Sequence, residues 1–213
     1  NFNSAIDNLH IRMRVDEDSQ AVVDQCGRCH ARRQQLTTKF EHGSSQLLDH
    51  YLPQLLTPPA YHSDGQILDE VYVYGSFVQS KMHQAGVVCS NCHEPHSNAL
   101  RATGNGVCAQ CHKASTYDTP DHHFHPVNST GASCANCHMT ESTYMGVDRR
   151  RDPSMRIPRP DLAVVIGTPN ACNQCHTQQT PTWALEALHN SFPTVAIPRP
   201  IAQQPLPMPA WAI

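Results

Sequence analysis

The feature that most constrains this chain is a five-residue pattern, Cys-x-x-Cys-His, which occurs five times and uses all ten cysteines. It reads CGRCH from Cys26, CSNCH from Cys89, CAQCH from Cys108, CANCH from Cys134 and CNQCH from Cys172, and we number these motifs one to five. Histidine accounts for 15 of the 213 residues. A chance histidine after all five pairs therefore has odds of roughly one in half a million, so the histidine belongs to the motif.

A Cys-x-x-Cys pair serves three chemistries: a redox disulfide, half of a zinc site, or thioether attachment of haem when a histidine follows directly. A thiolate zinc site tolerates a neighbouring histidine but does not require one at the same offset each time. A thioredoxin-like dithiol is expected once, at the start of a helix in a βαβ pattern. Haem attachment uses every residue of the motif, because two cysteines three apart reach one porphyrin edge and the next imidazole reaches the iron.

The sequence therefore predicts five covalently bound haems c. The predicted attachment residues are Cys26, Cys29, Cys89, Cys92, Cys108, Cys111, Cys134, Cys137, Cys172 and Cys175. The predicted proximal iron ligands are His30, His93, His112, His138 and His176.

Length and composition set the fold class. Five haems in 213 residues leave about 43 residues for each, too few to enclose every porphyrin in a shell of its own. Only 39% of the residues are apolar and 6% aromatic, so porphyrin faces must supply much of the buried apolar area. We predict a mainly α-helical chain with extensive irregular loops, in which the haems share one core and regular secondary structure is sparse.

The chain divides into three parts by composition. Residues 1–25 form a polar N-terminal arm, 26–192 the pentahaem domain and 193–213 a tail with six prolines. The tail reads as extended and polyproline-like. It is either disordered, or its apolar side chains pack on its own domain or on a neighbouring subunit.

Two segments have the pattern of helices. From Asp64, a possible cap, apolar residues recur at three- and four-residue steps as far as Met82, and Gly86 ends the pattern. The VYVY stretch inside it leaves a short strand as the alternative. A terminal helix is predicted from Pro181, with Thr180 as its cap. Motifs two to four follow one another within 50 residues, which predicts neighbouring haems.

Ten histidines lie outside the motifs, twice the number needed to bind every iron from its second face. They are His10, His42, His50, His62, His83, His96, His122, His123, His125 and His189. Such an excess predicts bis-histidine coordination, against the alternative that any one histidine is a surface group. The best placed are His62 and His83, which flank the predicted helix, His96 beside motif two, and His122 and His125 before motif four. Met82 or Met145 could replace one histidine, although core packing is their more ordinary use.

Charge indicates the partners and the compartment. The formal charge is −3, and haem propionates would make the protein more acidic, so nucleic acid is not an expected partner. Five arginines, Arg149, Arg150, Arg151, Arg156 and Arg159, are expected either to pair with propionates or to form a solvated basic loop.

No apolar run approaches 18 residues, so no transmembrane segment is predicted. The start at Asn1, without methionine, fits an exported protein whose signal peptide has been removed, in the periplasm or outside the cell.

The residues also resemble a known family. The runs DGQILDEVYVYGSFVQSKMHQAGVVCSNCHEPHS, YDTPDHHFH, CANCHMTESTYMGVDRRRDPSMRIPRPDL and GTPNACNQCH resemble the multihaem cytochrome c domain often joined to tetratricopeptide repeats in exported bacterial proteins. The resemblance covers roughly residues 26–192. It implies electron transfer with histidine-rich ligation, and it favours His62, His83, His96, His122 and His125 as ligands.

This chain departs from the resemblance in two places. Family members typically carry a histidine within RRDHS, where this chain has Pro153, so one iron is expected to have a substitute ligand or an open face. The repeat region is absent after residue 192, where the proline-rich tail stands instead.

Three functions follow as hypotheses. The leading one is an electron-transfer protein that exchanges electrons with redox partners, either as a subunit of an extracellular conductive filament or as a discrete periplasmic shuttle or redox-complex subunit. A filament needs an interface that does not close on itself, and the N-terminal arm and the tail are the expected contacts. The third hypothesis is a multihaem reductase with one open iron, for which no catalytic residue is predicted.

Overall fold

The computed structural model describes residues 19–95, 97 and 99–194. Within the chain, two compact units are distinguished, Asn1–Ile157 and Pro158–Ile213. The predicted arm before Ser19, the tail from residue 195, His10 and His96 lie outside the described residues. Among the residues described, no helix has both the length and the apolar character needed to cross a bilayer.

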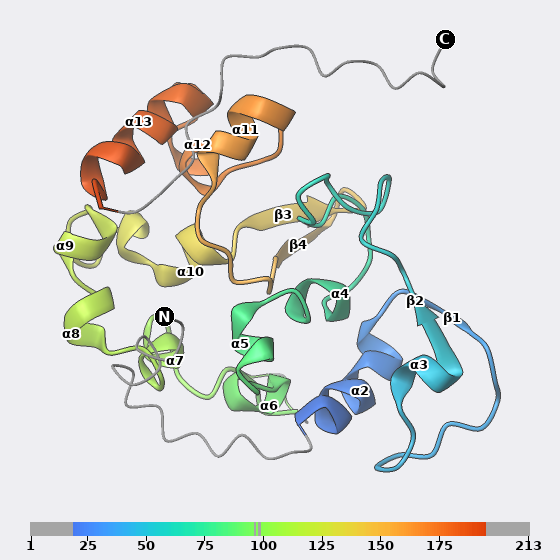
Figure 1. Cartoon of the computed structure of the whole chain (residues 1–213). Helices are drawn as coiled ribbons and strands as arrows, with labels where there is room; N and C mark the ends of the chain where they lie inside the picture. The colour runs from blue at the N-terminus through green and yellow to red at the C-terminus, as the bar shows by residue number, and fades with distance from the viewer. Residues whose placement is uncertain (1–18, 96, 98, 195–213) are drawn as a thin grey trace, which may run out of the picture. The chain divides into compact units, whose positions relative to one another are not determined.

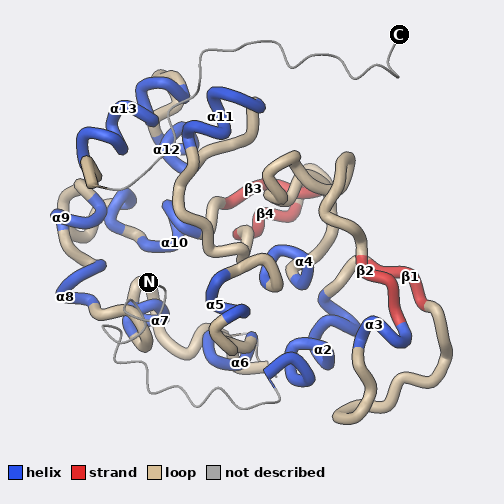
Figure 2. The backbone as a smooth tube through the Cα atoms, viewed as in Figure 1, coloured by secondary structure: helices blue, strands red, loops and turns tan. Residues whose placement is uncertain are grey.

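The first unit consists of short helices joined by long loops, with two small strand pairs (Figure 2). Its helices are α2 Ser19–His30, α3 Leu47–His50, α4 Tyr74–Phe77, α5 Lys81–Gln84, α6 Cys89–Cys92, α7 Gly106–Ala109, α8 Ala114–Tyr117, α9 Pro120–His123, the 3₁₀ turn η1 Thr130–Ala132 and α10 Cys134–His138. Its strands are β1 Arg33–Gln35, β2 Tyr51–Pro53, β3 Glu141–Tyr144 and β4 Asp148–Arg151. This sparse regular structure, mainly helical, confirms the predicted fold class.

Both strand pairs are antiparallel. β1 pairs with β2 in the register Gln34 to Leu52, and this ribbon lies beside α2 and α3 (Figure 1). β3 and β4 form a hairpin in the register Tyr144 to Asp148. Met145, one of the two methionines considered as an iron ligand, lies at the tip of this hairpin and is 67% exposed.

The first unit has a small protein core. Its buried apolar cluster comprises Ala60, Tyr61, Ile67, Val71 and Tyr144. Asp152 is also buried and joins the hairpin to this cluster, because its carboxylate accepts hydrogen bonds from the backbone N–H groups of Ile67 and Ser154. The core therefore lies between the segment 60–71 and the end of the β3–β4 hairpin.

The predicted continuous helix from Asp64 to Met82 is wrong. The carboxylate of Asp64 accepts hydrogen bonds from the backbone and side chain of Gln66, which forms a turn instead of capping a helix. Tyr72 has a left-handed backbone with φ of 60°, which a helix cannot contain. Only α4 and α5 form here, and no strand forms at VYVY. Gly86, with φ of 83°, does follow the end of α5 as predicted.

The second unit contains α11 Pro160–Ile166, α12 Ala171–Cys175 and α13 Pro181–Ser191. The predicted start of α13 is confirmed: Thr180 Oγ1 accepts a hydrogen bond from the N–H of Trp183, and Pro181 occupies the first turn. Ala184 and Leu185 are the buried residues of this helix. α11 and α12 both contact it.

Candidate haem sites

Every motif contains a helical turn. The backbone N–H groups of His93, His112 and His176 each donate to the carbonyl of the first cysteine of their motif, over 3.0, 2.9 and 2.8 Å. In motifs one and four the histidine is itself the last residue of α2 or α10. Because residues three apart lie on one side of a helical turn, this geometry places both thiols of each motif on the same side.

The cysteines are placed for thioether attachment. All ten lie within the described ranges, none forms a disulfide, and all are half-buried or exposed. Between residues 81 and 131, which contain motifs two and three, none of the described residues is buried. A segment with no protein core needs another apolar group to pack against, and five porphyrins would provide one.

Motif two also has an unsatisfied ring nitrogen. Nδ1 of His93 is buried and has no hydrogen-bond partner among the described residues. An imidazole of this motif would bind iron through its other nitrogen, Nε2, so the fit does not depend on Nδ1. The exposure of the ten thiols and the lack of a buried residue among those described between 81 and 131 show that the residues present fit covalently bound haem.

Motifs one to four lie next to one another in chain order. A hydrogen bond between Cys26 and Cys89, which lowers the pKa of Cys26 and raises that of Cys89, joins motifs one and two. The pKa of Cys92 is raised, first by burial and then by the charge of Cys111, which indicates that motif two lies near motif three. Motifs three and four meet through Cys108 and Cys134, where burial and then the charge of Cys108 raise the pKa of Cys134 to about 11.

Asn105 fixes the spacing of motifs three and four. Its side-chain N–H₂ group donates to Asp118 Oδ1 and to the carbonyl of Ala132, over 2.8 and 2.9 Å. Its side-chain oxygen accepts from the N–H of Cys134 over 2.9 Å. Since Asn105 precedes Cys108 by three residues, one side chain joins the start of motif three to the first residue of motif four.

The clearest candidate for an iron-ligand pair is His122 with His138. The two ring centroids are 6.2 Å apart and the ring planes are inclined by 14°. Two imidazoles that each hold one iron at about 2 Å would have centroids about 6 Å apart. The sequence predicted both residues as ligands, but only the fold brings α9 and α10 close enough to pair them.

Hydrogen bonds select the tautomers of two histidines. His138 Nδ1 lies 2.8 Å from the carbonyl oxygen of Arg156, and His125 Nδ1 contacts the carbonyl oxygen of His123. A carbonyl can only accept, so in both neutral rings Nδ1 carries the proton and Nε2 carries the lone pair. Both imidazoles are therefore in the form that binds iron through Nε2.

His122 and His112 also lie in environments that disfavour protonation. Burial, followed by the charge of His138, lowers the pKa of both rings. A neutral ring keeps a lone pair on one nitrogen, which is the state an iron ligand needs.

The other predicted second-face ligands differ in placement. His83 lies beside α2, where its Nε2 is 3.0 Å from Gln20 Oε1. This hydrogen bond would have to give way before that nitrogen could bind iron. His62 is half-buried at the turn closed by its backbone hydrogen bond with Gln66. The roles of His62, His83, His96, His122 and His125 stay predictions.

Motif five belongs to the second unit. Asn170 caps α12, because its side chain accepts from the N–H of Asn173 over 3.1 Å. The ring of His176, just after this helix, lies 4.9 Å from the ring of Trp183 on α13. The terminal helix therefore packs directly against the predicted ligand.

The arginine cluster has protein partners. Arg149 forms an ion pair with Glu141, and Arg150 forms ion pairs with Glu70 and Asp148. Arg159 pairs with Asp161. Burial raises the pKa of Asp161, but the hydrogen bond and charge of Arg159, with backbone hydrogen bonds, outweigh burial and hold that pKa below its usual value. Arg151 donates to Asn136 and to the carbonyl of Met139. Arg156 donates to Ser154, to Gln79 and to the carbonyl of Asp64. Pairing of these groups with haem propionates stays a prediction.

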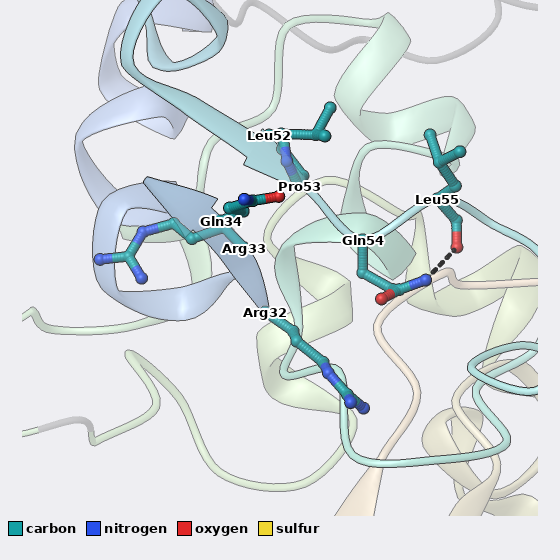
Figure 3. A pocket seen from close by; sticks show the side chains of 7 residues that line it. All are labelled: Arg32, Arg33, Gln34, Leu52, Pro53, Gln54 and Leu55. Carbon is teal, nitrogen blue, oxygen red and sulfur yellow. Dashed lines mark hydrogen bonds between the residues drawn. The ribbon is translucent and has the colours of Figure 1, made fainter. Parts of the chain in front are cut away.

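A surface groove on the β1–β2 ribbon is not one of these sites. It has a volume of about 310 Å³ and is formed by residues 32–34 and 52–55 of the β1–β2 ribbon. The side chains of Arg32 and Arg33 point in different directions there (Figure 3). They do not converge on one anion, and no predicted ligand lines the groove.

Two residues of these sites were not identified from the sequence: Asn105 and, as an anchor, Arg156. Their contacts reach across loops of different lengths, so no fixed spacing marks them. Asn105 carried a weak signal, because asparagine three residues before a motif is a plausible helix cap.

Comparison with known proteins agrees with this geometry. Residues 82–116, which contain motifs two and three, match the family model for a doubled CXXCH motif. No curated protein matches the chain. The crystal structure of the outer cell wall cytochrome OcwA is similar, with a TM-score of 0.60 and 15% sequence identity over 79% of this chain and 51% of OcwA.

This chain thus spans about half the length of OcwA, and at such low identity the likeness concerns the fold alone. The doubled motif and the fold together support a multihaem c-type cytochrome.

Proposed function

We propose that this chain is an exported electron-transfer protein that holds five haems c, most of them between two histidines. The observation that carries the proposal is the separation of 6.2 Å between His122 and His138. It is supported by five motifs with the same local turn and by the proximity of motifs one to four.

Haem c supplies one-electron transfer when it is bound. The ten motif cysteines would hold the porphyrins, and the five motif histidines would bind the irons from one face. His122 and His125 would bind from the second face, with His62, His83 and His96 as the further candidates. Histidines on both faces leave no position for a substrate, so these residues favour electron transfer over bond chemistry.

The order of the motifs favours a path for electrons. Hydrogen bonds join Cys26 to Cys89 and Cys108 to Cys134, and Cys92 lies near Cys111. Cofactors tethered to neighbouring cysteines are held close, which electron hopping requires. Export is supported by the thioether chemistry and by the likeness to OcwA, an outer cell wall cytochrome.

Whether the protein works as a filament subunit or as a discrete shuttle is the finer part of the proposal. We favour a filament with contacts through the N-terminal arm and the tail. Negative-stain electron microscopy of concentrated native protein should show fibres, whereas monodisperse particles at every concentration would support a shuttle or redox-complex subunit.

Carbon monoxide binding tests the ligand pair. The reduced protein should bind little carbon monoxide, and His122→Ala should convert about one fifth of the haem, one of five. His50→Ala is the control, because His50 is not among the favoured ligands and contacts Thr37 and Phe40, and it should behave as the wild type does. A His122→Ala variant that binds no more than the wild type would contradict the pair. If the wild type itself binds at one-fifth occupancy, one iron is open and a reductase gains support.

A further inference from the structure

Tyr117 lies between two predicted iron ligands. Its ring centroid is 5.7 Å from that of His112 and 5.4 Å from that of His122, and its plane is inclined by 89° to each. His112 belongs to motif three, and His122 pairs with His138 of motif four. One phenol ring therefore makes an edge-to-face contact with a ligand of each of two neighbouring haem sites.

The backbone around Tyr117 gives this ring little freedom. Tyr117 is the last residue of α8, and its N–H donates to the carbonyl of Lys113. The next residue, Asp118, accepts a hydrogen bond from Asn105 over 2.8 Å. Pro120 then fixes the start of α9, which carries His122. Motif three, the tyrosine and the histidine are thus held by a short segment that is anchored at both ends.

Cys108, His112, Tyr117 and Cys134 also line one small cavity of about 10 Å³. The tyrosine thus lies at the junction of motifs three and four, beside the first cysteine of each. Its exposure is intermediate, so it is partly covered within this junction.

We infer that Tyr117 is a positioning residue that sets the orientation of the His122 imidazole, and so the angle between the two ligand planes of the haem bound at motif four. An edge-to-face contact depends on the relative orientation of the rings, so rotation of His122 about its bond to iron would disturb the contact. The other ring of the pair, His138, is held by its hydrogen bond to the carbonyl of Arg156. With both ligands held, the angle of 14° between their planes becomes a fixed property of the site.

This inference rests on the proposed function, because it takes His122 and His138 as ligands of one iron. Its spectroscopic consequence is separate. In low-spin ferric haem with two imidazoles, nearly parallel ligand planes give a rhombic electron paramagnetic resonance signal, whereas nearly perpendicular planes give a single feature at large g. The signal of the motif-four haem should therefore be rhombic.

The experiment is frozen-solution electron paramagnetic resonance of the oxidised holoprotein. The motif-four signal is identified as the low-spin signal lost in His122→Ala. In Tyr117→Ala this signal, about one fifth of the low-spin intensity, should broaden and move toward large g, while the other signals stay in place. Tyr117→Phe keeps the ring and should restore the wild-type signal. Tyr72→Ala, which removes an exposed tyrosine, is the matched control.

The outcomes separate the two claims. If His122→Ala loses one signal but Tyr117→Ala leaves that signal unchanged, the role of Tyr117 is overturned and the ligand pair stands. If His122→Ala loses no low-spin signal, the ligand pair of the proposed function itself fails. Should Tyr117→Ala not fold, Tyr117→Leu keeps the bulk without the ring and is expected to show the same shift. In the wild type, a large-g feature as the signal that His122→Ala removes would also overturn the inference.

Discussion

His138 and Arg156 are joined twice: the backbone N–H of Arg156 donates to the carbonyl of His138, and Nδ1 of His138 donates to the carbonyl of Arg156 over 2.8 Å. The guanidinium of Arg156 is held in turn by Ser154, Gln79 and the carbonyl of Asp64, each over 2.9 Å. The predicted proximal ligand of motif four is thus attached to the protein core through one arginine.

Replacing Arg156 by lysine should raise the reduction potential of one haem. Lysine cannot keep three hydrogen bonds in the fork geometry of arginine, so the carbonyl that accepts from His138 becomes less well placed. A weaker acceptor makes the imidazole a poorer donor to ferric iron. We expect a shift on the order of 1 kcal/mol, or about 40 mV for one electron. Spectroelectrochemical titration measures the reduction potential of each haem.

Arg149→Lys is the control, because the side chain of Arg149 is 74% exposed, and it should leave all five potentials in place. Equal shifts in both variants would contradict the prediction.

Replacing Gly131 by alanine should disturb one haem site. A Cβ at Gly131 would collide with the ring of His125, so the ring must move, at a cost of about 1–3 kcal/mol. If His125 is a ligand, the Soret band of about one fifth of the haem should change as well.

Gly106→Ala provides the comparison for Gly131. Its Cβ would meet only Ala102, at an ordinary 3.5 Å, and within α7 alanine should stabilise by up to about 1 kcal/mol. Identical spectra for the two variants would argue against His125 as a ligand.

Asp152 should be the most costly carboxylate to remove from the β3–β4 hairpin. It is 4% exposed and accepts from the N–H groups of Ile67 and Ser154, over 3.3 and 2.9 Å. Asp152→Ala leaves both donors buried and unsatisfied, which predicts a loss of about 2–3 kcal/mol in the free energy of unfolding. Thermal unfolding followed by far-ultraviolet circular dichroism measures the loss.

Asp148→Ala is the control, because it removes a surface ion pair from the same hairpin and should cost less than about 1 kcal/mol. A similar cost for both variants would refute the stabilising role of the buried Asp152 carboxylate.

Stability should decline in strong alkali. Burial, and then the charges of Asp152 and Tyr144, raise the pKa of Tyr61 to about 12, and burial and then Asp152 raise that of Tyr144 to about 12. Unfolded tyrosine ionises near pH 10. A raised pKa in the folded state means that the contribution is complete below about pH 10 and is lost as the pH rises toward about 12.

Urea unfolding at stepped pH should therefore show the free energy of unfolding falling across this window, and less steeply in Tyr144→Phe. Parallel declines in the wild type and the variant would show that the buried tyrosines are not the cause.

The sequence was sufficient where the determinants are local. Thr180 and Pro181 lie within the turn that they start, so the beginning of α13 could be predicted correctly. The helical turn of each motif likewise depends on a few neighbouring residues. The helix predicted from Asp64 failed because its apolar residues pack into the cluster around Tyr61 and Tyr144, and tertiary contact outweighed periodicity.

The approach of His122 to His138 could not be predicted in the same way. His122 and His138 are 16 positions apart in the sequence, and their approach depends on the loop between them and on the hydrogen bonds of Asn105. The arginine cluster gave a similar result. Its density indicated anion binding, but Glu70 lies 80 positions before its partner Arg150, and Glu141 lies on the strand that faces Arg149.

Intact mass spectrometry of the purified holoprotein under denaturing conditions shows whether all ten motif cysteines tether five porphyrins. We predict a mass equal to that of the polypeptide plus five haem groups, with no thiol left to react with an alkylating reagent. A mass with fewer than five additions, or alkylation of any motif cysteine in protein that contains zinc, would contradict the account.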